Sequence, residues 1–287
     1  MQKRYFLLLI IPLLFACKSK PPVIIPEQNP SAELVLEHIE AQSTSKFTLH
    51  YRLVAVNPRS IPAAISINDW TGHIDGIELD SGNSELKLDG ETPFTIEPAS
   101  VSEKRMTLEL ALDKHPAFTD SNGDQYTVNM IVNMDFLYEQ QEPLALAVTT
   151  ETISPRIREP QFTITAIAVL QAELINTRFR VSIKIDNPNV FPVSLSSFSY
   201  ELYGDGRFWA EGKEKELLDI PALSSGETNI FLIMNFINMR RQLLDDIIAL
   251  RDVQYRFLGE VTVGTGVPIL PGFRMDFERS GNSPVYR

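Results

Sequence analysis

The sequence predicts an all-β protein of two tandem β-sandwich domains, the second carrying one α-helix. Over residues 179–185 apolar and polar side chains alternate, the period of a strand with one buried face. Asn187-Pro188 then ends the strand, because proline has no N–H to donate to a neighbouring strand. Asn57-Pro58 ends a similar strand 130 residues earlier. We therefore predict two copies of one β-module.

Composition and charge limit the classes of function. The chain has 287 residues, long enough for two domains, and 44% apolar with 22% charged residues is close to the globular average. This composition excludes a wholly disordered chain. The net charge of −11 provides no basic surface for nucleic acid and no attraction to anionic lipid headgroups. Any membrane attachment must therefore depend on something other than charge.

Residues 1–16 have the parts of a secretory signal peptide. Lys3 and Arg4 precede an apolar stretch at 6–15 that is too short to span a membrane. The following LFAC sequence resembles the lipobox of bacterial lipoproteins, which implies a lipid on Cys17. Cys17 is the only cysteine and so cannot belong to an intrachain disulfide. The alternative is an ordinary signal anchor with an incidental cysteine.

Residues 17–32 are expected to form the lipidated cysteine and a flexible, proline-rich tether. The covalent lipid on Cys17 would give firm membrane anchoring, and we expect no other cofactor. Lys18 occupies the position where an aspartate commonly retains such proteins at the inner membrane. By this analogy the predicted location is the bacterial cell envelope, at the outer membrane and facing the periplasm.

Residues 33–156 are predicted to form the first sandwich from about seven short strands separated by turns. The expected strands lie at 33–39, 47–53, 65–70, 85–88, 96–98 paired with 106–112, 128–136 and 144–150.

The loop at Asp120, Asn122 and Asp124 has the alternate spacing of a calcium loop. Gln125 replaces the usual glycine, however, and Ile131 replaces the usual glutamate. A hairpin turn is the favoured interpretation, and a metal site is the alternative.

Two prolines within 154–160 indicate the domain boundary, and residues 157–280 are predicted to form the second sandwich. Residues 230–236 are apolar on both faces, which is typical of a central strand. Residues 239–250 have helical periodicity. The last strand is expected at 267–276, and residues 280–287 are expected to be frayed.

The stretch IDNPNVFPVSLSSFSYELYGDGRFWAEGK, residues 185–213, resembles the late embryogenesis abundant group 2 family, also called the water-stress and hypersensitive-response (WHy) domain. The shared features are Asn187-Pro188-Asn189, Tyr200 before a short strand and turn, and a later Ile-Pro loop. The resemblance covers 160–278, and 33–152 less closely. It implies a fibronectin-III or immunoglobulin-like sandwich with one helix. It also implies a role in stress protection or in contacting lipid or protein, without catalytic residues.

The asparagine–proline motifs are interpreted as structural rather than ligand-binding. We expect each asparagine side chain to satisfy backbone groups where proline ends the ladder. The motif residues are Asn57, Pro58, Asn187, Pro188 and Asn189.

No catalytic constellation is recognisable in the sequence. The four histidines, His38, His50, His73 and His115, lack metal-ligand neighbours at helical or strand spacing. There is no nucleophile elbow, no phosphate-binding glycine loop and no Cys-His pair. Exposed aromatics for a partner could be Trp70, Phe208 and Trp209, although core packing is the simpler interpretation.

Three functions are therefore considered. The first is a non-catalytic envelope lipoprotein that binds a protein or an apolar ligand. The second is a desiccation or cold-stress protectant of client proteins. The third is a hydrolase built on loops at one end of a sandwich.

Overall fold

The computed structural model describes residues 29–80, 82–113, 115, 123–171, 177–234 and 252–286, and this part confirms an all-β fold. The first half contains β1 (Ser31–Ala41), β2 (Lys46–Asn57), β3 (Ala63–Ile74), β4 (Ile77–Glu78), β5 (Ser84–Leu88), β6 (Phe94–Ile96), β7 (Ser100–Ala111), β8 (Gln125–Tyr138) and β9 (Leu144–Pro155). The second half contains β10 (Gln161–Gln171), β11 (Thr177–Asn187), β12 (Val193–Gly204), β13 (Arg207–Ile220), β14 (Ser224–Met234), β15 (Val253–Val267), β16 (Leu270–Ser283) and β17 (Val285–Tyr286). The helix predicted at 239–250 lies outside the described residues.

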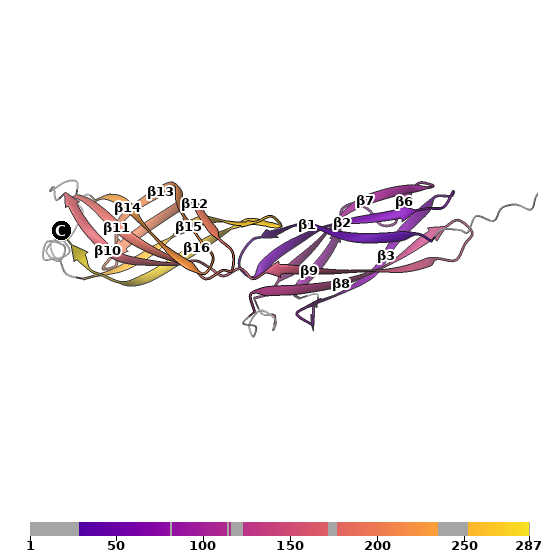
Figure 1. Ribbon diagram of the computed structural model, residues 1–287, viewed down its shortest axis with the longest axis horizontal. Coiled ribbons are helices and arrows are strands. Elements are labelled where there is room, and N and C mark those ends of the chain that lie inside the picture. Colours follow the sequence, from indigo (N-terminus) through magenta and orange to yellow (C-terminus); the bar gives the residue numbers. More distant parts are fainter. Residues whose placement is uncertain are drawn as a thin grey trace, which may run out of the picture.

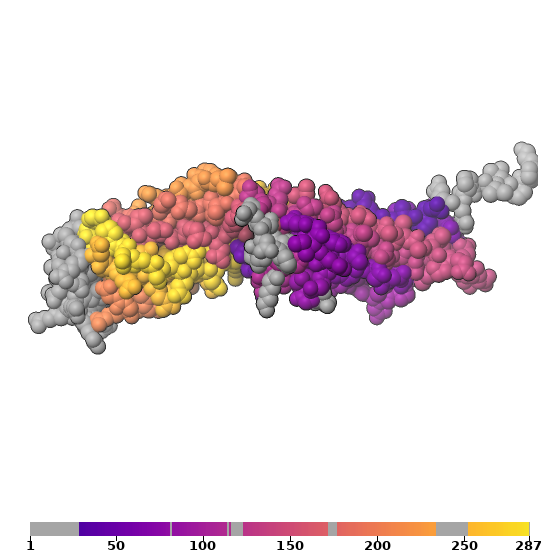
Figure 2. Space-filling model, turned by 90° about the horizontal axis from the view of Figure 1, so that it is seen from below, coloured from indigo at the N-terminus to yellow at the C-terminus, as the bar shows by residue number. Residues whose placement is uncertain are grey.

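Each half contains two layers of strands, and one layer of each half belongs to an eight-stranded sheet that runs through both halves. In the first half, strands β1-β2-β7-β5 form one layer and β4-β3-β8-β9 form the other, with β6 paired to β3. In the second half the layers are β14-β11-β10-β17 and β13-β12-β15-β16. The halves lie end to end in an elongated molecule (Figures 1 and 2). They are joined through β1 and β16, where Ala41 pairs with Phe273 and the Ile39 amide donates to the Ile269 carbonyl at 2.6 Å.

Alternating side chains fill the space between the sheets. In β11 the inward residues Phe179, Val181, Ile183 and Ile185 are all buried. An aromatic cluster crosses the second half, in which the rings of Phe162 and Phe277 stack at 4.6 Å. Burying one such side chain contributes about 1.5–3 kcal/mol, so these stripes are the main reason that the sheets pack.

Two Asp-Gly turns show the same chemistry in both halves. Asp75 and Gly76 have φ angles of 50° and 81°, and Asp205 and Gly206 have 48° and 76°. Positive φ at both central residues is the requirement of a tight hairpin that follows the twist of its strands. Each aspartate also accepts a backbone N–H bond from a neighbouring strand, from Thr127 at 2.8 Å and from Gln254 at 3.1 Å.

Two sequence predictions about strand pairing and chain ends were wrong. Residues 96–98 and 106–112 do not pair, because β6 adds to β3 whereas β7 lies between β2 and β5. Residues 280–287 were expected to fray, yet β16 extends to Ser283 and Val285 is buried in β17 beside β10. Glycine at position 281 allows β16 to continue beside β15, because a Cβ there would lie 2.8 Å from the Tyr255 hydroxyl.

The prediction that residues 230–236 form a central strand was also wrong. Strand β14 lies at the edge of its sheet and pairs with β11. Its inward residues Ile230 and Leu232 are buried, whereas Phe231 and Ile233 are 64% and 62% exposed. The apolar run therefore covers both the core and an outer surface.

Buried tyrosines make the stability sensitive to alkaline pH. Tyr200 lies over Gly212 on the neighbouring strand, where a Cβ would come within 2.2 Å of the hydroxyl. Burial, with a smaller effect from Glu214, raises the pKa of Tyr200 to about 12. Burial likewise raises the pKa of Tyr126 to about 12, although the Arg156 charge opposes this.

We expect stability to fall between pH 10 and pH 12, because the unfolded tyrosines ionise first and the folded ones do not. The loss is about 2–3 kcal/mol for each tyrosine. Urea unfolding at pH 9 and pH 11.5 measures it. Tyr200→Phe should reduce the alkaline loss while changing stability at pH 9 little, and an equal loss in both proteins would contradict the assignment.

Candidate functional site: the asparagine turns and an exposed sheet face

Asn57 is fully buried at the end of β2, where Pro58 stops the ladder. Its Nδ2 atom donates to the carbonyls of Ile61 at 2.8 Å and Glu97 at 3.1 Å. Its Oδ1 atom accepts the backbone N–H of Arg59 at 3.2 Å. The side chain therefore joins the turn after β2 to the loop before β7.

Asn187 makes the same contacts at the end of β11, before Pro188. Its Nδ2 atom donates to the carbonyls of Phe191 at 2.9 Å and Pro221 at 3.0 Å. Its Oδ1 atom accepts the backbone N–H of Asn189 at 3.0 Å and the Asn189 side chain at 2.9 Å. In both turns the polar atoms of the first asparagine are engaged by the protein itself.

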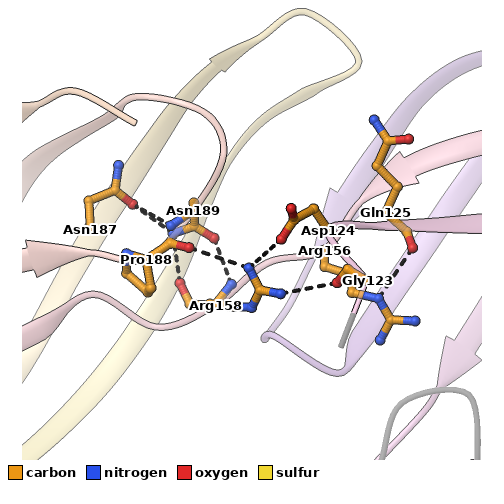
Figure 3. Close-up of polar contacts among 8 residues, drawn as sticks. All are labelled: Gly123, Asp124, Gln125, Arg156, Arg158, Asn187, Pro188 and Asn189. Carbon is orange, nitrogen blue, oxygen red and sulfur yellow. Dashed lines mark hydrogen bonds and ion pairs between the residues drawn. The ribbon is translucent and has the colours of Figure 1, made fainter. Parts of the chain in front are cut away.

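Asn189 connects the second turn to the segment that links the halves (Figure 3). Its side chain accepts the Arg158 backbone N–H at 2.7 Å and donates to the Arg158 carbonyl at 2.8 Å. The Arg158 guanidinium then reaches the first half, forming an ion pair with Asp124 at 2.7 Å and donating to the Gly123 carbonyl at 3.0 Å. Arg158 thus bridges the two halves.

Arg156 is held more deeply at the same junction, with only 6% of its side chain exposed. Its Nη2 atom forms an ion pair with Asp75 at 2.7 Å, and its Nε atom donates to the Gln125 carbonyl at 3.2 Å. The guanidinium carbon lies 3.8 Å from the centre of the Tyr126 ring. Sequence reasoning missed both arginines, since it used this segment only as a boundary.

The remaining candidate residues are dispersed. Cys17, Asp120 and Asn122 lie outside the described residues, and Asp124 is engaged by Arg158. In the described ranges there is no group of three His, Cys, Asp or Glu side chains that could hold a metal ion. The same ranges contain no helix long and apolar enough to cross a membrane.

Among the histidines, the His38 and His50 rings stack at 4.1 Å, and the buried His115 lies 3.3 Å from the Glu78 carbonyl. His73 lies in β3 and pairs with Glu78 in β4. Of the three candidate aromatics, Trp209 is buried, Trp70 is half-buried and Phe208 is 52% exposed.

A surface that the sequence did not indicate lies on the outer face of β14-β11-β10-β17. Neighbouring strands align Phe231 with Arg180, Arg180 with Ala168, and Ala168 with Tyr286. The next row aligns Ile233 with Arg178. We call this surface the arginine–aromatic face; it consists of Arg178, Arg180, Phe231, Ile233 and Tyr286.

The arginines of this face differ in their partners from Arg52, which lies on the corresponding strand β2 of the first half. Arg52 on β2 forms ion pairs with Glu37 at 3.0 Å and Glu103 at 2.9 Å. Within the described part of the chain, Arg178 and Arg180 have no ion-pair partner. The face therefore combines two arginines, unpaired with any described carboxylate, and exposed apolar side chains.

Residues 182–279 match the family model described as late embryogenesis abundant protein, which confirms the predicted resemblance over that part of the second half. No curated protein matches the sequence. A protein from Archaeoglobus fulgidus is 17% identical and covers 44% of this chain and 94% of its own, with a TM-score of 0.27. Red sea bream transglutaminase is 11% identical and covers 88% and 31%, with a TM-score of 0.24. The periplasmic chaperone SfaE is 7% identical and covers 90% and 100%, with a TM-score of 0.25.

Proposed function

We propose that this protein is a non-catalytic, lipid-anchored component of a bacterial envelope that binds another protein through the arginine–aromatic face. The supporting observation is the exposure of Phe231, Ile233 and Tyr286, at 64%, 62% and 53%, around two arginines that have no carboxylate partner among the described residues. Aromatic residues and arginine are enriched at the centres of protein interfaces and among the residues that dominate their binding energy.

The path of the chain supports presentation of this face away from a membrane. Strand β1 begins at Ser31, paired with Val56, and ends at Ala41, where it meets the second half. Its 11 residues span about 35 Å, so the chain enters the folded part at the end opposite the junction. Strands β10, β11 and β14, in the sheet whose outer face is the arginine–aromatic face, lie beyond the junction (Figure 1). A lipid on Cys17 would therefore hold the first half nearer the membrane.

We also infer that 33–156 is a second copy of the domain that carries the family match. Beyond the asparagine and Asp-Gly turns, Ala99 and Leu223 both have a φ angle of 49°. The Ala99 backbone N–H donates to the Arg59 carbonyl at 2.8 Å, and the Leu223 backbone N–H donates to the Asn189 carbonyl at 2.9 Å. Such detailed repetition supports two tandem LEA2/WHy-like sandwiches. The predicted bounds of 33–156 and 157–280 are narrower than the folded part, which begins with β1 at Ser31 and includes β17 at Val285–Tyr286.

Anchoring is tested by Cys17→Ser in the bacterium that produces the protein. We expect the natural protein to incorporate labelled palmitate and to remain with the membrane fraction, because several buried acyl methylenes give firm attachment. Cys17→Ser should lose the label and the membrane association, whereas Ser19→Ala should keep both. If the natural protein takes up no label but stays in the membrane fraction, the N-terminal segment is an ordinary signal anchor instead.

Binding is tested by recovering envelope proteins with the full chain and with Phe231→Asp. The substitution should lower recovery of a specific partner at least tenfold. The matched control is Val101→Asp, which changes a 58% exposed side chain on the corresponding strand β7 of the first half. Equal recovery by all three proteins would exclude this face as the binding surface.

The family match over 182–279 favours a second candidate function, protection of client proteins during desiccation or cold. A lactate dehydrogenase freeze–thaw assay distinguishes the two functions. Protection by surface hydration should be equal for the natural protein and Phe231→Asp, because one exposed side chain changes hydration little. Absence of protection by either protein would remove this candidate.

A further inference from the structure

We propose that the arginine–aromatic face of one chain docks on the opposite, carboxylate-bearing face of the second half of another copy. Anchored chains would then associate side by side in the plane of the membrane. This inference names the partner of the binding face and so rests on the proposed binding function.

The acceptor surface is the outer face of β13-β12-β15-β16. One row across these strands aligns Glu211 with Glu201, Glu201 with Leu258, and Leu258 with Glu278. These residues, together with Lys213, line a hollow of about 960 Å³. In the adjacent row, Phe208 is 52% exposed and lies edge-on to the Tyr203 ring at 5.6 Å. We call this surface the carboxylate face; it consists of Glu201, Tyr203, Phe208, Glu211, Leu258 and Glu278.

Glu201 and Glu211 oppose one another directly across β12 and β13. Like charges in this position destabilise a sheet, so the pairing has a cost in the isolated molecule. Glu201 accepts a hydrogen bond from the Tyr203 hydroxyl at 2.8 Å. Neither carboxylate has an ion-pair partner among the residues that the structure describes. A cation supplied from outside would relieve the repulsion.

Arg178 and Arg180 have the spacing that such a contact needs. They lie two residues apart on β11, about 7 Å along one face of the strand. The opposed glutamates Glu201 and Glu211 are separated by about 5 Å across their strands. Two guanidinium groups can therefore meet two carboxylates, and charge-assisted hydrogen bonds of this kind are the stronger class.

Apolar side chains accompany the charges on both faces. Phe231 and Tyr286 flank the arginines, and Phe208 and Leu258 flank the carboxylates. Each face thus has an apolar part and a charged part. On the carboxylate face Arg256 already forms an ion pair with Glu278 at 2.6 Å, so the negative charge available to a second copy is that of Glu201 and Glu211. Because the chain as a whole carries a net charge of −11, contact between other surfaces of two copies is opposed by repulsion.

The two faces lie on opposite sides of one sandwich, so the contact is between unlike surfaces and leaves one face free on each chain. Such contacts form rows rather than closed dimers. Chains held in one membrane with their long axes side by side would also have a raised effective concentration. A modest contact could therefore be populated on the membrane.

Cysteine cross-linking in membranes tests the contact with full-length protein. The single native cysteine is Cys17, so introduced cysteines can be assigned. Ser182 lies beside Arg180 on the outer face of β11, and Ser199 lies beside Glu201 on the outer face of β12. Cells producing Ser182→Cys and Ser199→Cys together should yield a cross-linked dimer, at least tenfold above cells producing either variant alone. A dimer formed equally by one variant with itself, or no dimer at all, would overturn the proposal.

Charge reversal tests the chemistry of the contact in the same cross-linking background. Arg178→Glu with Arg180→Glu should lower cross-linking at least tenfold, as should Glu201→Arg with Glu211→Arg. A chain carrying all four reversals should regain it, because both faces are then inverted. The matched control is Arg105→Glu, an exposed arginine on the outer face of β7, which should have no effect. Cross-linking that survives both reversals would contradict the inference.

Failure of this inference can be separated from failure of the binding function. If the chain does not cross-link with itself but loses a specific envelope protein on Arg178→Glu with Arg180→Glu, the face binds another protein. That result overturns association between copies and leaves the proposed binding function standing. If Arg178→Glu with Arg180→Glu reduces neither cross-linking between copies nor recovery of an envelope protein, the result contradicts both the association and the binding function.

Discussion

Replacing Asn187 by alanine is expected to lower the free energy of unfolding by about 3 kcal/mol. The side chain is 2% exposed and donates to the carbonyls of Phe191 and Pro221. Alanine leaves these acceptors, and the backbone N–H of Asn189, without their partner in a region where water has little access. Each buried group left unsatisfied costs about 1–3 kcal/mol, partly offset by local relaxation. Urea unfolding at pH 7 measures the difference.

Two further variants test whether the loss of stability comes from the buried contacts of the asparagine side chain. Asn57→Ala should have a similar effect, because Asn57 makes the corresponding contacts in the first half. Asn229→Ala, on the exposed face of β14, should change stability by less than about 0.5 kcal/mol. An unchanged stability of Asn187→Ala would contradict the structural role of the motif and would favour the ligand-binding interpretation.

The positions of these asparagines were predictable, but their acceptors were not. Alternation around Phe179 and Ile185 predicts the strand, and Pro188 predicts its end, because both are local properties of the backbone. Pro221 lies 34 residues beyond Asn187, and only the folded chain brings its carbonyl within 3.0 Å. No local pattern specifies that distance.

The arginine–aromatic face could not be predicted from the sequence, because a continuous apolar run does not distinguish a strand buried on both faces from an edge strand with one exposed face. Phe231 and Ile233 resemble core residues in a continuous apolar run, and only the strand order shows that β14 is an edge strand.

The internal repeat predicted the role of individual residues only in part. The 130-residue shift that matches Asn57 to Asn187 places Gly82 opposite Gly212. Gly212 lies beneath Tyr200, whereas Gly82 lies in a turn beside Asp80. A repeat in sequence need not preserve the role of each residue.

Replacing Arg156 by methionine is expected to destabilise the protein by about 3 kcal/mol, the lower end of the range for breaking a buried ion pair. The lower end applies because the Asp75 side chain is 28% exposed and water can partly replace the guanidinium. Methionine preserves contact with the Tyr126 ring, so the loss reports the ion pair and the bond to the Gln125 carbonyl. Urea unfolding of the full chain is the measurement.

Arg158→Met is the matched comparison, since Arg158 and Asp124 form an equally short ion pair that is 36% and 54% exposed. Exposed pairs contribute at most about 1 kcal/mol, so this variant should be close to the natural protein. Adding Asp75→Asn to Arg156→Met should cost less than the two separate losses combined, because it removes the carboxylate that Arg156→Met leaves unpaired. Equal losses for Arg156→Met and Arg158→Met would mean that burial does not distinguish these two ion pairs.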